Sequence, residues 1–251
     1  MKRVISVSWL PIAALLVWQT AAVAGVLNPL FVPAPAALFA AAAAMIRSGE
    51  LLGNAAATVG RAVAGFTIGS TAGITIGLAM GSARTVRQSL EPVVSALNAT
   101  PKLSLFPLLM LVFGIGETAR LSIIALSSFV ITAIHALDAV RNIHPAWVEL
   151  ARNYGARRRD LFGAVYLPAC LPQVFTGMRI GLANALVVAI SCELVNPSSG
   201  LGSLIWLAWQ TFSTERLYVT ILATALLGGG LHAGLRMFER RLVPWKTPHA
   251  G

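Results

Sequence analysis

Charged residues are scarce in this chain of 251 residues: they make up 11% of it, whereas hydrophobic residues make up 57%. A soluble protein of this size would need more polar groups to cover its surface, so the composition indicates a membrane protein. The net charge of +10 does not indicate nucleic-acid binding, because the basic residues lie in short loops between apolar runs and not on one hydrophilic face. We therefore expect membrane lipid, and no nucleic acid, around this protein.

Cysteine is rare as well, and metal-ligating residues are scattered. Cys170 and Cys192 fall in one predicted helix, where about 22 residues at about 1.5 Å each separate them by about 33 Å, too far for a disulfide. The histidines show no spacing typical of metal ligands; they are His135, His144, His232 and His249. We expect no disulfide within the chain and no metal site.

The chain also lacks the Gly-x-x-x-x-Gly-Lys-Ser/Thr loop that binds nucleotide phosphates. Gly114-Ile115-Gly116 is not extended to a dinucleotide-binding motif, and Gly228-Gly229-Gly230 lies in an apolar run without a nearby lysine. We expect this chain to bind no cofactor and no ATP. A transporter that works against a gradient would then take its energy from a partner subunit or from an ion gradient.

Long apolar runs are what the chain does contain. A membrane-spanning helix needs roughly 20 residues, and about six runs approach or exceed this length: residues 8–26, 54–81, 92–113, 119–140, 171–195 and 218–238. The sequence therefore predicts an all-α membrane protein that crosses the bilayer several times. We expect a single transmembrane domain over residues 1–251, with a core at about 54–242 and an N-terminal membrane helix and external segment in 1–53.

Basic residues predict the orientation, because lysines and arginines in short loops stay on the cytoplasmic side. They cluster at Lys2 and Arg3, at Arg84 and Arg87, in residues 141–159, and from Arg236 to the C-terminus. Both termini and the 141–159 loop are therefore expected in the cytoplasm. Residues 1–24, which end in Ala22-Val23-Ala24 before Gly25, also fit a cleavable signal peptide, whose removal would leave the rest oriented in the same way.

Glycines recur every four residues in the second apolar run, at Gly65, Gly69, Gly73, Gly77 and Gly81. This spacing places them on one slowly drifting face of a helix. In a bilayer such a face lets a neighbouring helix approach closely. We expect a packing surface; the alternative is a smooth face along which helices slide during transport.

Prolines interrupt the third run, at Pro101 and Pro107. Each removes a backbone donor and bends or breaks a helix, and broken helices at membrane depth are tolerated where they are buried or line a wet cavity. Asn98, Thr100 and Ser104 are therefore candidates for a solute pathway. They could equally bridge the carbonyls that the prolines leave without donors.

Polar residues also interrupt the fifth run, and they include Asn184, Ser191 and Glu193. An ionisable residue within a span is a candidate functional site, so Glu193 could be a gate or a structural latch. Because it lies near the predicted outer end, it could instead reach water or pair with Arg216 at the surface.

Two short helices are expected at the outer membrane surface, in residues 36–47 and 204–212. The second contains Trp206 and Trp209, which suit an interfacial helix. A solute-binding protein that docks outside would contact two loops. One is the proline-rich loop before residues 36–47, and the other is the loop before residues 204–212.

A polar island separates the fourth and fifth runs. Pro145 can open a short helix and Gly155 can close it, because glycine accepts a positive φ. A second helical pattern then runs up to Leu167-Pro168. Apolar side chains lie among the charges of this island, namely Trp147, Leu150, Tyr154 and Phe162. Such a surface suits a soluble partner, unless these side chains fold back onto the protein's own core.

The spacing within the island favours a partner. The island reads Glu149-Leu150-Ala151-Arg152-Asn153-Tyr154-Gly155, then nine residues, then Val165-Tyr166-Leu167-Pro168. It resembles the cytoplasmic EAA-motif loop of bacterial ABC importer membrane subunits, with Leu150 where that family usually has alanine. Three more stretches resemble the branch that imports nitrate, sulfonates, taurine and related solutes: Val32-Pro33-Ala34-Pro35, Arg47-Ser48-Gly49-Glu50-Leu51, and Pro107-Leu108 through Phe113-Gly114-Ile115-Gly116-Glu117.

This resemblance, which extends from about Trp18 to Leu242, implies a permease subunit of type I architecture in the bacterial inner membrane. It implies three partners: cytoplasmic ATPase subunits that bind ATP and Mg²⁺, a periplasmic or lipoprotein solute-binding protein, and a second copy of this chain. Contact with the ATPase would be made by Glu149, Leu150, Ala151, Tyr154, Gly155, Leu167 and Pro168. We expect Glu149 to cap or pair within the helix, and Leu150 and Ala151 to fill a groove on the ATPase.

Two other classes of function fit the sequence less well. An ion-coupled carrier would bury several acids near the membrane midplane, but Glu117 and Asp138 fall at the ends of predicted spans. A membrane-embedded enzyme would need a nucleophile with a base, paired carboxylates or a metal set, and the sequence offers none. An ATPase subunit that copurifies with this chain would support the interpretation as an ABC importer permease over both alternatives.

Overall fold

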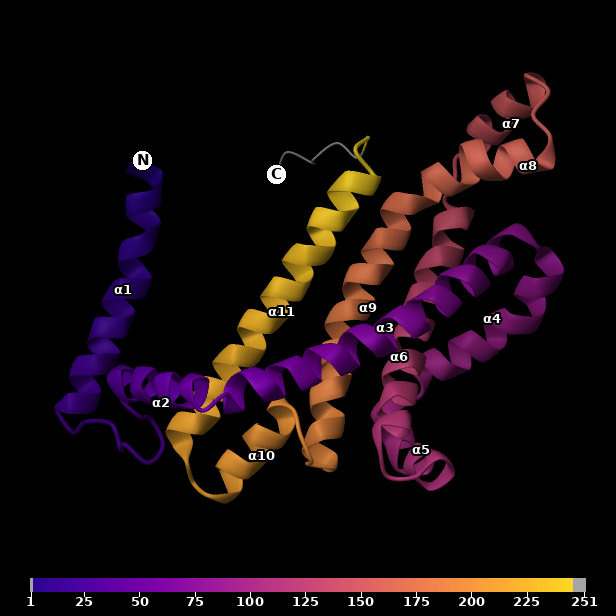
Figure 1. Cartoon of the computed structure of the whole chain (residues 1–251). Helices are drawn as coiled ribbons and strands as arrows, with labels where there is room; N and C mark the ends of the chain where they lie inside the picture. The colour runs from indigo at the N-terminus through magenta and orange to yellow at the C-terminus, as the bar shows by residue number, and fades with distance from the viewer. Residues whose placement is uncertain (1, 246–251) are drawn as a thin grey trace. The chain divides into compact units, whose positions relative to one another are not determined.

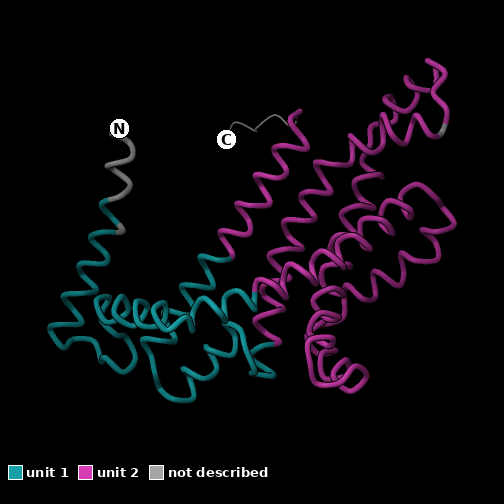
Figure 2. Tube along the Cα trace, viewed as in Figure 1, with its two compact units in different colours: residues 1–58, 193–227 teal, residues 59–192, 228–251 magenta. Residues whose placement is uncertain are grey.

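The computed structural model describes residues 2–245, and of residues 2–8, 11 and 158 it describes the backbone alone. No strand occurs within these residues; every regular element among them is a helix. The chain forms two compact units, residues 1–58 with 193–227 and residues 59–192 with 228–251 (Figure 2). Helices α3, α9 and α11 each contribute to both units.

Unit 1 contains short helices around the ends of longer ones. Its elements are α1 (Lys2–Val23), α2 (Pro35–Arg47), the start of α3 (Glu50–Ser82), the end of α9 (Leu167–Val195), α10 (Leu201–Gln210) and the start of α11 (Thr214–Leu242). Its core contains Leu38, Met45 and Leu201. The short helices predicted at 36–47 and 204–212 are thus present as α2 and α10, and α2 begins at a proline because a first turn needs no donor there.

Unit 2 contains the remaining parts of α3, α9 and α11 and all the elements between α3 and α9. These are α4 (Arg84–Ala99), the 3₁₀ turn η1 (Lys102–Leu105), α5 (Phe106–Phe113), α6 (Glu117–Arg141), α7 (Pro145–Asn153), α8 (Arg158–Leu161) and the π-helical turn η2 (Phe162–Tyr166) (Figure 1). Its largest core cluster includes Phe66, Phe106, Ile123 and Leu186.

Four helices of the described residues are long and apolar enough to cross a membrane. They are α3, α6, α11 and the continuous helix Arg159–Val195 that includes α9. The expected first run lies in α1, whose described apolar part, Ile12–Val23, is shorter. The third run is not one straight span, because α4 and the η1–α5 segment are bent by 93°. Thr100 precedes Pro101 and is therefore extended, with ψ 132°.

The helix that precedes the fifth run does not end at Leu167-Pro168, as the sequence suggested. The chain stays helical from Arg159 to Val195, and Pro168 lies just after η2. In this wider turn the Leu167 N–H donates to Phe162 O, five residues back. The register of backbone hydrogen bonds therefore shifts just before the proline, so the missing proline N–H does not break the helix.

The glycine face of α3 lies directly against α6. A Cβ atom added at Gly65 would lie 2.5 Å from Ile124 Cγ2, and one added at Gly73 would lie 2.5 Å from the carbonyl oxygen of Phe129. Gly69, Gly77 and Gly81 meet α6 in the same way. This close approach stabilises the helix pair through dispersion contacts, which act in a membrane where the hydrophobic effect between helices does not.

Candidate functional site

Helix α7 begins as the sequence predicts, but Glu149 does not cap it. The cap is His144, whose Nδ1 accepts a hydrogen bond from Ala146 N at 3.3 Å, and Pro145 occupies the first turn. The Glu149 side chain is exposed, and it has no hydrogen-bond or ion-pair partner among the described side chains. The expectation that Glu149 caps or pairs within its own helix is therefore wrong, because a neighbouring histidine already satisfies the helix start.

Helix α7 ends in a turn that requires glycine. Gly155 has φ +81°, its N–H donates to Arg152 O at 2.9 Å, and Ala156 N donates to Ala151 O at 3.0 Å. These two bonds are those of the Schellman motif, in which a residue in the left-handed region reverses the chain and satisfies the last carbonyls of the helix. Gly155 thus sets the angle at which the chain leaves α7.

Apolar side chains of this segment are exposed, although charges surround them. Tyr154 is 84% exposed and Leu150 is 57% exposed, and Trp147, Phe162 and Leu167 are exposed as well. The alternative in which these side chains fold back onto the core of the chain is therefore excluded. Figure 1 shows α7 and α8 at the end of unit 2 where α6 ends and the long helix of α9 begins.

Two pockets flank α7 within unit 2. The first has a volume of about 380 Å³ and is lined by Trp147, Ala164, Val165, Pro168, Ala169, Pro172 and Trp245. The second has a volume of about 360 Å³ and is lined by Gly81, Ser82, Arg152, Leu161, Phe162 and Tyr166. The residues of the predicted motif are thus divided: Glu149, Leu150 and Tyr154 lie on the exposed part of α7 and its end, whereas Pro168 lines the apolar pocket.

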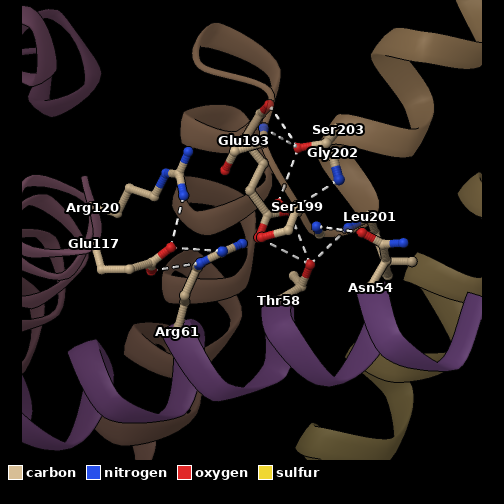
Figure 3. Close-up of polar contacts among 12 residues, drawn as sticks. Asn54, Thr58, Arg61, Glu117, Arg120, Glu193, Ser199, Leu201, Gly202 and Ser203 are labelled. Carbon is tan, nitrogen blue, oxygen red and sulfur yellow. Dashed lines mark hydrogen bonds and ion pairs between the residues drawn. The ribbon is translucent and has the colours of Figure 1, made fainter. Parts of the chain in front are cut away.

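Glu193 lies in a polar cluster of unit 1, not at the surface (Figure 3). Its residue is 0% exposed. Thr58 Oγ1 donates to the carboxylate at 2.9 Å, and Gly202 N donates to it at 3.0 Å. The Thr58 hydroxyl in turn accepts a hydrogen bond from Leu201 N at 2.8 Å. The carboxylate therefore joins α9, α3 and the start of α10, which is the geometry of a latch.

The proposed surface pair between Glu193 and Arg216 is wrong. Arg216 forms an ion pair with Glu50 instead. Gly200 explains how the carboxylate is enclosed: it has φ +107°, and a Cβ atom there would collide with Glu193. Asn54 Oδ1 accepts from Gly200 N at 2.6 Å and holds this turn. No local pattern predicts these contacts, because Thr58 and Asn54 are about 140 positions from their partners along the chain.

A second polar cluster lies in unit 2, where α6 begins. Arg61 contacts Glu117 through two hydrogen bonds, Nε to Oε2 at 2.8 Å and Nη2 to Oε1 at 2.7 Å. Arg120 Nη1 also donates to Glu117 Oε1, at 2.8 Å (Figure 3). Both arginine side chains are almost fully buried. Charged side chains that are buried in membrane-spanning helices are paired with one another. The ion pairs of this cluster join α3 to α6.

The remaining pathway candidates fall into separate places. Asn98, Thr100 and Ser104 lie together at the bend between α4 and α5. Asn184 Nδ2 donates to Ser127 Oγ of α6, and the Ser191 hydroxyl donates to Val187 O of its own helix. Lys102, which belongs to no motif in the sequence, also lies at this bend, and its Nζ donates to Asn98 O at 3.0 Å.

Comparison with known families identifies this architecture. Residues 69–244 match the model of the binding-protein-dependent transport system inner membrane component family. The chain belongs to this family. The protein is therefore an ABC importer permease subunit, an inner-membrane protein that crosses the bilayer several times. The family implies ATP-binding subunits and a solute-binding protein as partners, and it makes the chain a transport subunit and not an enzyme.

Named relatives align with nearly the whole permease. It is 32% identical to the taurine transport system permease protein of Escherichia coli K12, over 98% of this chain and 91% of the relative. It is 35% identical to a putative aliphatic sulfonates transport permease protein of the same strain, over 96% and 92%. The riboflavin transport system permease protein of Chloroflexus aurantiacus is also 35% identical, over 95% and 90%.

Solved structures share the fold of this permease. An amino acid ABC transporter matches with a TM-score of 0.64 and 18% identity, over 79% of this chain and 97% of that one. The MetNI methionine ABC transporter in an inward facing conformation matches with a TM-score of 0.61 and 18% identity, over 76% and 94%. These matches support the type I importer architecture.

Proposed function

We propose that this permease imports small organic sulfonates, such as taurine and aliphatic sulfonates, in an ATP-driven complex. The observation that carries the proposal is the alignment over almost the entire chain with permeases named for taurine and for aliphatic sulfonates. Nitrate and related small oxyanions belong to the same proposed range of solutes. The equal identity to a permease named for riboflavin makes riboflavin the second candidate.

The α7 segment is the proposed contact with the ATPase. Its exposed Leu150 and Tyr154 offer apolar surface that a groove on a soluble subunit would cover, and Gly155 fixes the direction of the chain behind them. ATP and Mg²⁺ would bind to that subunit, and this chain would hold no nucleotide. The exposed Glu149 carboxylate would then pair with a basic group or an N–H donor of the partner, because it has none in its own helix.

The assembly would contain two copies of this chain, two ATPase subunits and an external solute-binding protein. Closure of the ATPases would pull α7 of each copy, and rocking of the long helices would open the pathway to the outside; hydrolysis would return it. The binding protein would dock on the outer loops of unit 1, where Leu30 and Phe31 are exposed and are held to α11 by Thr214 and Tyr218.

Copurification from native membranes tests the assembly, and reconstitution tests the solute. The tagged permease should bring an ATPase and a binding protein in fixed ratio, and proteoliposomes of the complex should take up taurine or ethanesulfonate when ATP is inside. Thermal stabilisation of the binding protein by each solute would rank the candidates. Uptake of riboflavin without uptake of either sulfonate would overturn the proposed solute, and uptake by this chain alone would overturn the ATP-driven mechanism.

A further inference from the structure

The bend between α4 and α5 lies beside the middle of α6. Val94, before the bend, shares a core cluster with Val130 and Leu137 of α6. Phe106, after the bend, shares a cluster with Ile123 near the start of α6. Because α6 runs from Glu117 to Arg141 as a membrane-spanning helix, the backbone between Thr100 and Leu105 leaves the α-helical path at about half the depth of that span.

Irregular backbone at such a depth is tolerated where it lines a wet cavity or is buried in protein. Here the residues at the bend are not all buried: Asn98 and Ser104 are exposed on this chain. Earlier in α4, Gln88 and Ser95, which lie on the same face of the helix as Asn98, are exposed as well. A polar face of this kind does not suit lipid. It therefore faces water, and in discontinuous spans of transporters such positions hold substrate and coupling ions.

Lys102 carries the positive charge at this bend. It is the one lysine between Lys2 and Lys246 in the whole chain. Its ammonium group donates to the carbonyl oxygen of Asn98 at 3.0 Å and lies 3.5 Å from the Asn98 side-chain oxygen. An ammonium group has three donors. One donor therefore caps the end of α4, a second is directed to the Asn98 side-chain oxygen, and the third remains for a ligand with acceptor oxygens.

We propose that Lys102, together with the Asn98 amide group and the Ser104 hydroxyl, binds the anionic group of the solute as it passes the middle of the membrane. This inference rests on the proposed function, because a sulfonate is the solute group in question. A sulfonate presents three acceptor oxygens and a full negative charge. A lysine at half depth compensates that charge through charge-assisted hydrogen bonds, which are stronger where water is excluded.

The test is uptake by the complete complex in proteoliposomes, with taurine and ethanesulfonate as probes. Lys102→Gln should lower uptake of both solutes about 10-fold, the order expected for a lost charge-assisted hydrogen bond. ATP hydrolysis stimulated by the loaded binding protein should change less than about twofold, because α7 is untouched. Lys102→Arg should restore most of the uptake, since it keeps the charge.

Arg87→Gln is the matched control. It removes one positive charge from α4, the helix that precedes Lys102, beside Glu91 and far from the bend, and it should leave uptake unchanged. If Lys102→Gln takes up both sulfonates like the unmodified complex, the site is refuted while the proposed function stands. If Lys102→Gln lowers uptake, ATP hydrolysis and melting temperature together and arginine restores none of them, Lys102 is a helix cap alone. If the unmodified complex takes up neither sulfonate, the proposed function fails and this site fails with it.

Discussion

Glu193 interrupts an apolar run and Glu149 belongs to the polar island between two such runs, and the two side chains lie in opposite environments. Glu193 is fully buried and accepts hydrogen bonds from Thr58 and from the backbone of Gly202. Glu149 is exposed on α7, and no described side chain pairs with it. The first carboxylate satisfies its hydrogen-bonding capacity within the chain, whereas the second keeps its capacity for another molecule.

This difference separates stability from function. A buried carboxylate with several donors contributes to the fold, because losing one donor leaves a charged group without compensation. An exposed segment with few contacts contributes little to the stability of the folded state. Changes around Glu193 should therefore lower stability first, and changes around Glu149 should lower transport first.

The largest effect is expected from Leu150→Asp on the exposed segment. Placing a carboxylate at an apolar contact should weaken binding of the ATPase about 100-fold, the size seen when a central contact of an interface is lost. The melting temperature of the isolated permease in detergent should not change. Asn153→Asp adds the same charge on the same helix and is the control. Equal loss of ATPase binding in both variants would show that charge, and not the Leu150 side chain, determines the contact.

Thr58→Val should give the largest loss of stability. Valine has the shape of threonine but can neither donate to Glu193 nor accept from Leu201 N, so the free energy of unfolding should fall by about 3 kcal/mol. Thr58→Ser keeps the hydroxyl and should retain most of the stability. Thermal unfolding of the purified permease measures both variants. A Thr58→Val variant as stable as the unmodified protein would contradict the latch.

Much of the helical layout follows from the sequence, because apolar runs of sufficient length and a proline or glycine at their ends specify it locally. Pro145 and Gly155 bound α7 as expected, and the glycine face of α3 indicates a close neighbour. The 93° bend was foreseen as an interruption at Pro101, but its angle depends on packing against α6. Pro168 looked like a helix end and is not one, because a π-helical turn precedes it.

The polar clusters were far less predictable. Glu193 and Thr58 are 135 positions apart, so their contact depends on how α3 and α9 fold and not on any local pattern. Lys102 belongs to no motif in the sequence, whereas in the structure it lies at a bend beside the middle of α6. Local signals predict elements; long-range contacts decide which polar residues meet.

Gly155→Val should affect coupling more than stability. A β-branched residue at φ +81° costs about 1–2 kcal/mol in the left-handed region, and the turn would relax by changing the direction of the chain after α7. ATP hydrolysis should then continue without solute uptake in the reconstituted complex. Gly155→Asn is the control, because asparagine tolerates this conformation. Normal uptake by the valine variant would show that the turn does not transmit motion.

The smallest effect on stability is expected from Glu149→Gln. Making the same exchange at Glu193 compares the two glutamates directly. The exchange is nearly isosteric, and since no described group pairs with Glu149, the free energy of unfolding should change by less than about 0.5 kcal/mol. The same exchange at Glu193 turns an amide N–H₂ toward groups that donate, so stability should fall by about 2 kcal/mol. Thermal unfolding of the two variants side by side measures the difference. Similar melting temperatures for both variants would mean that the hydrogen bonds from Thr58 and Gly202 to Glu193 do not stabilise the fold. The distinction between a structural Glu193 and a functional Glu149 would then be wrong.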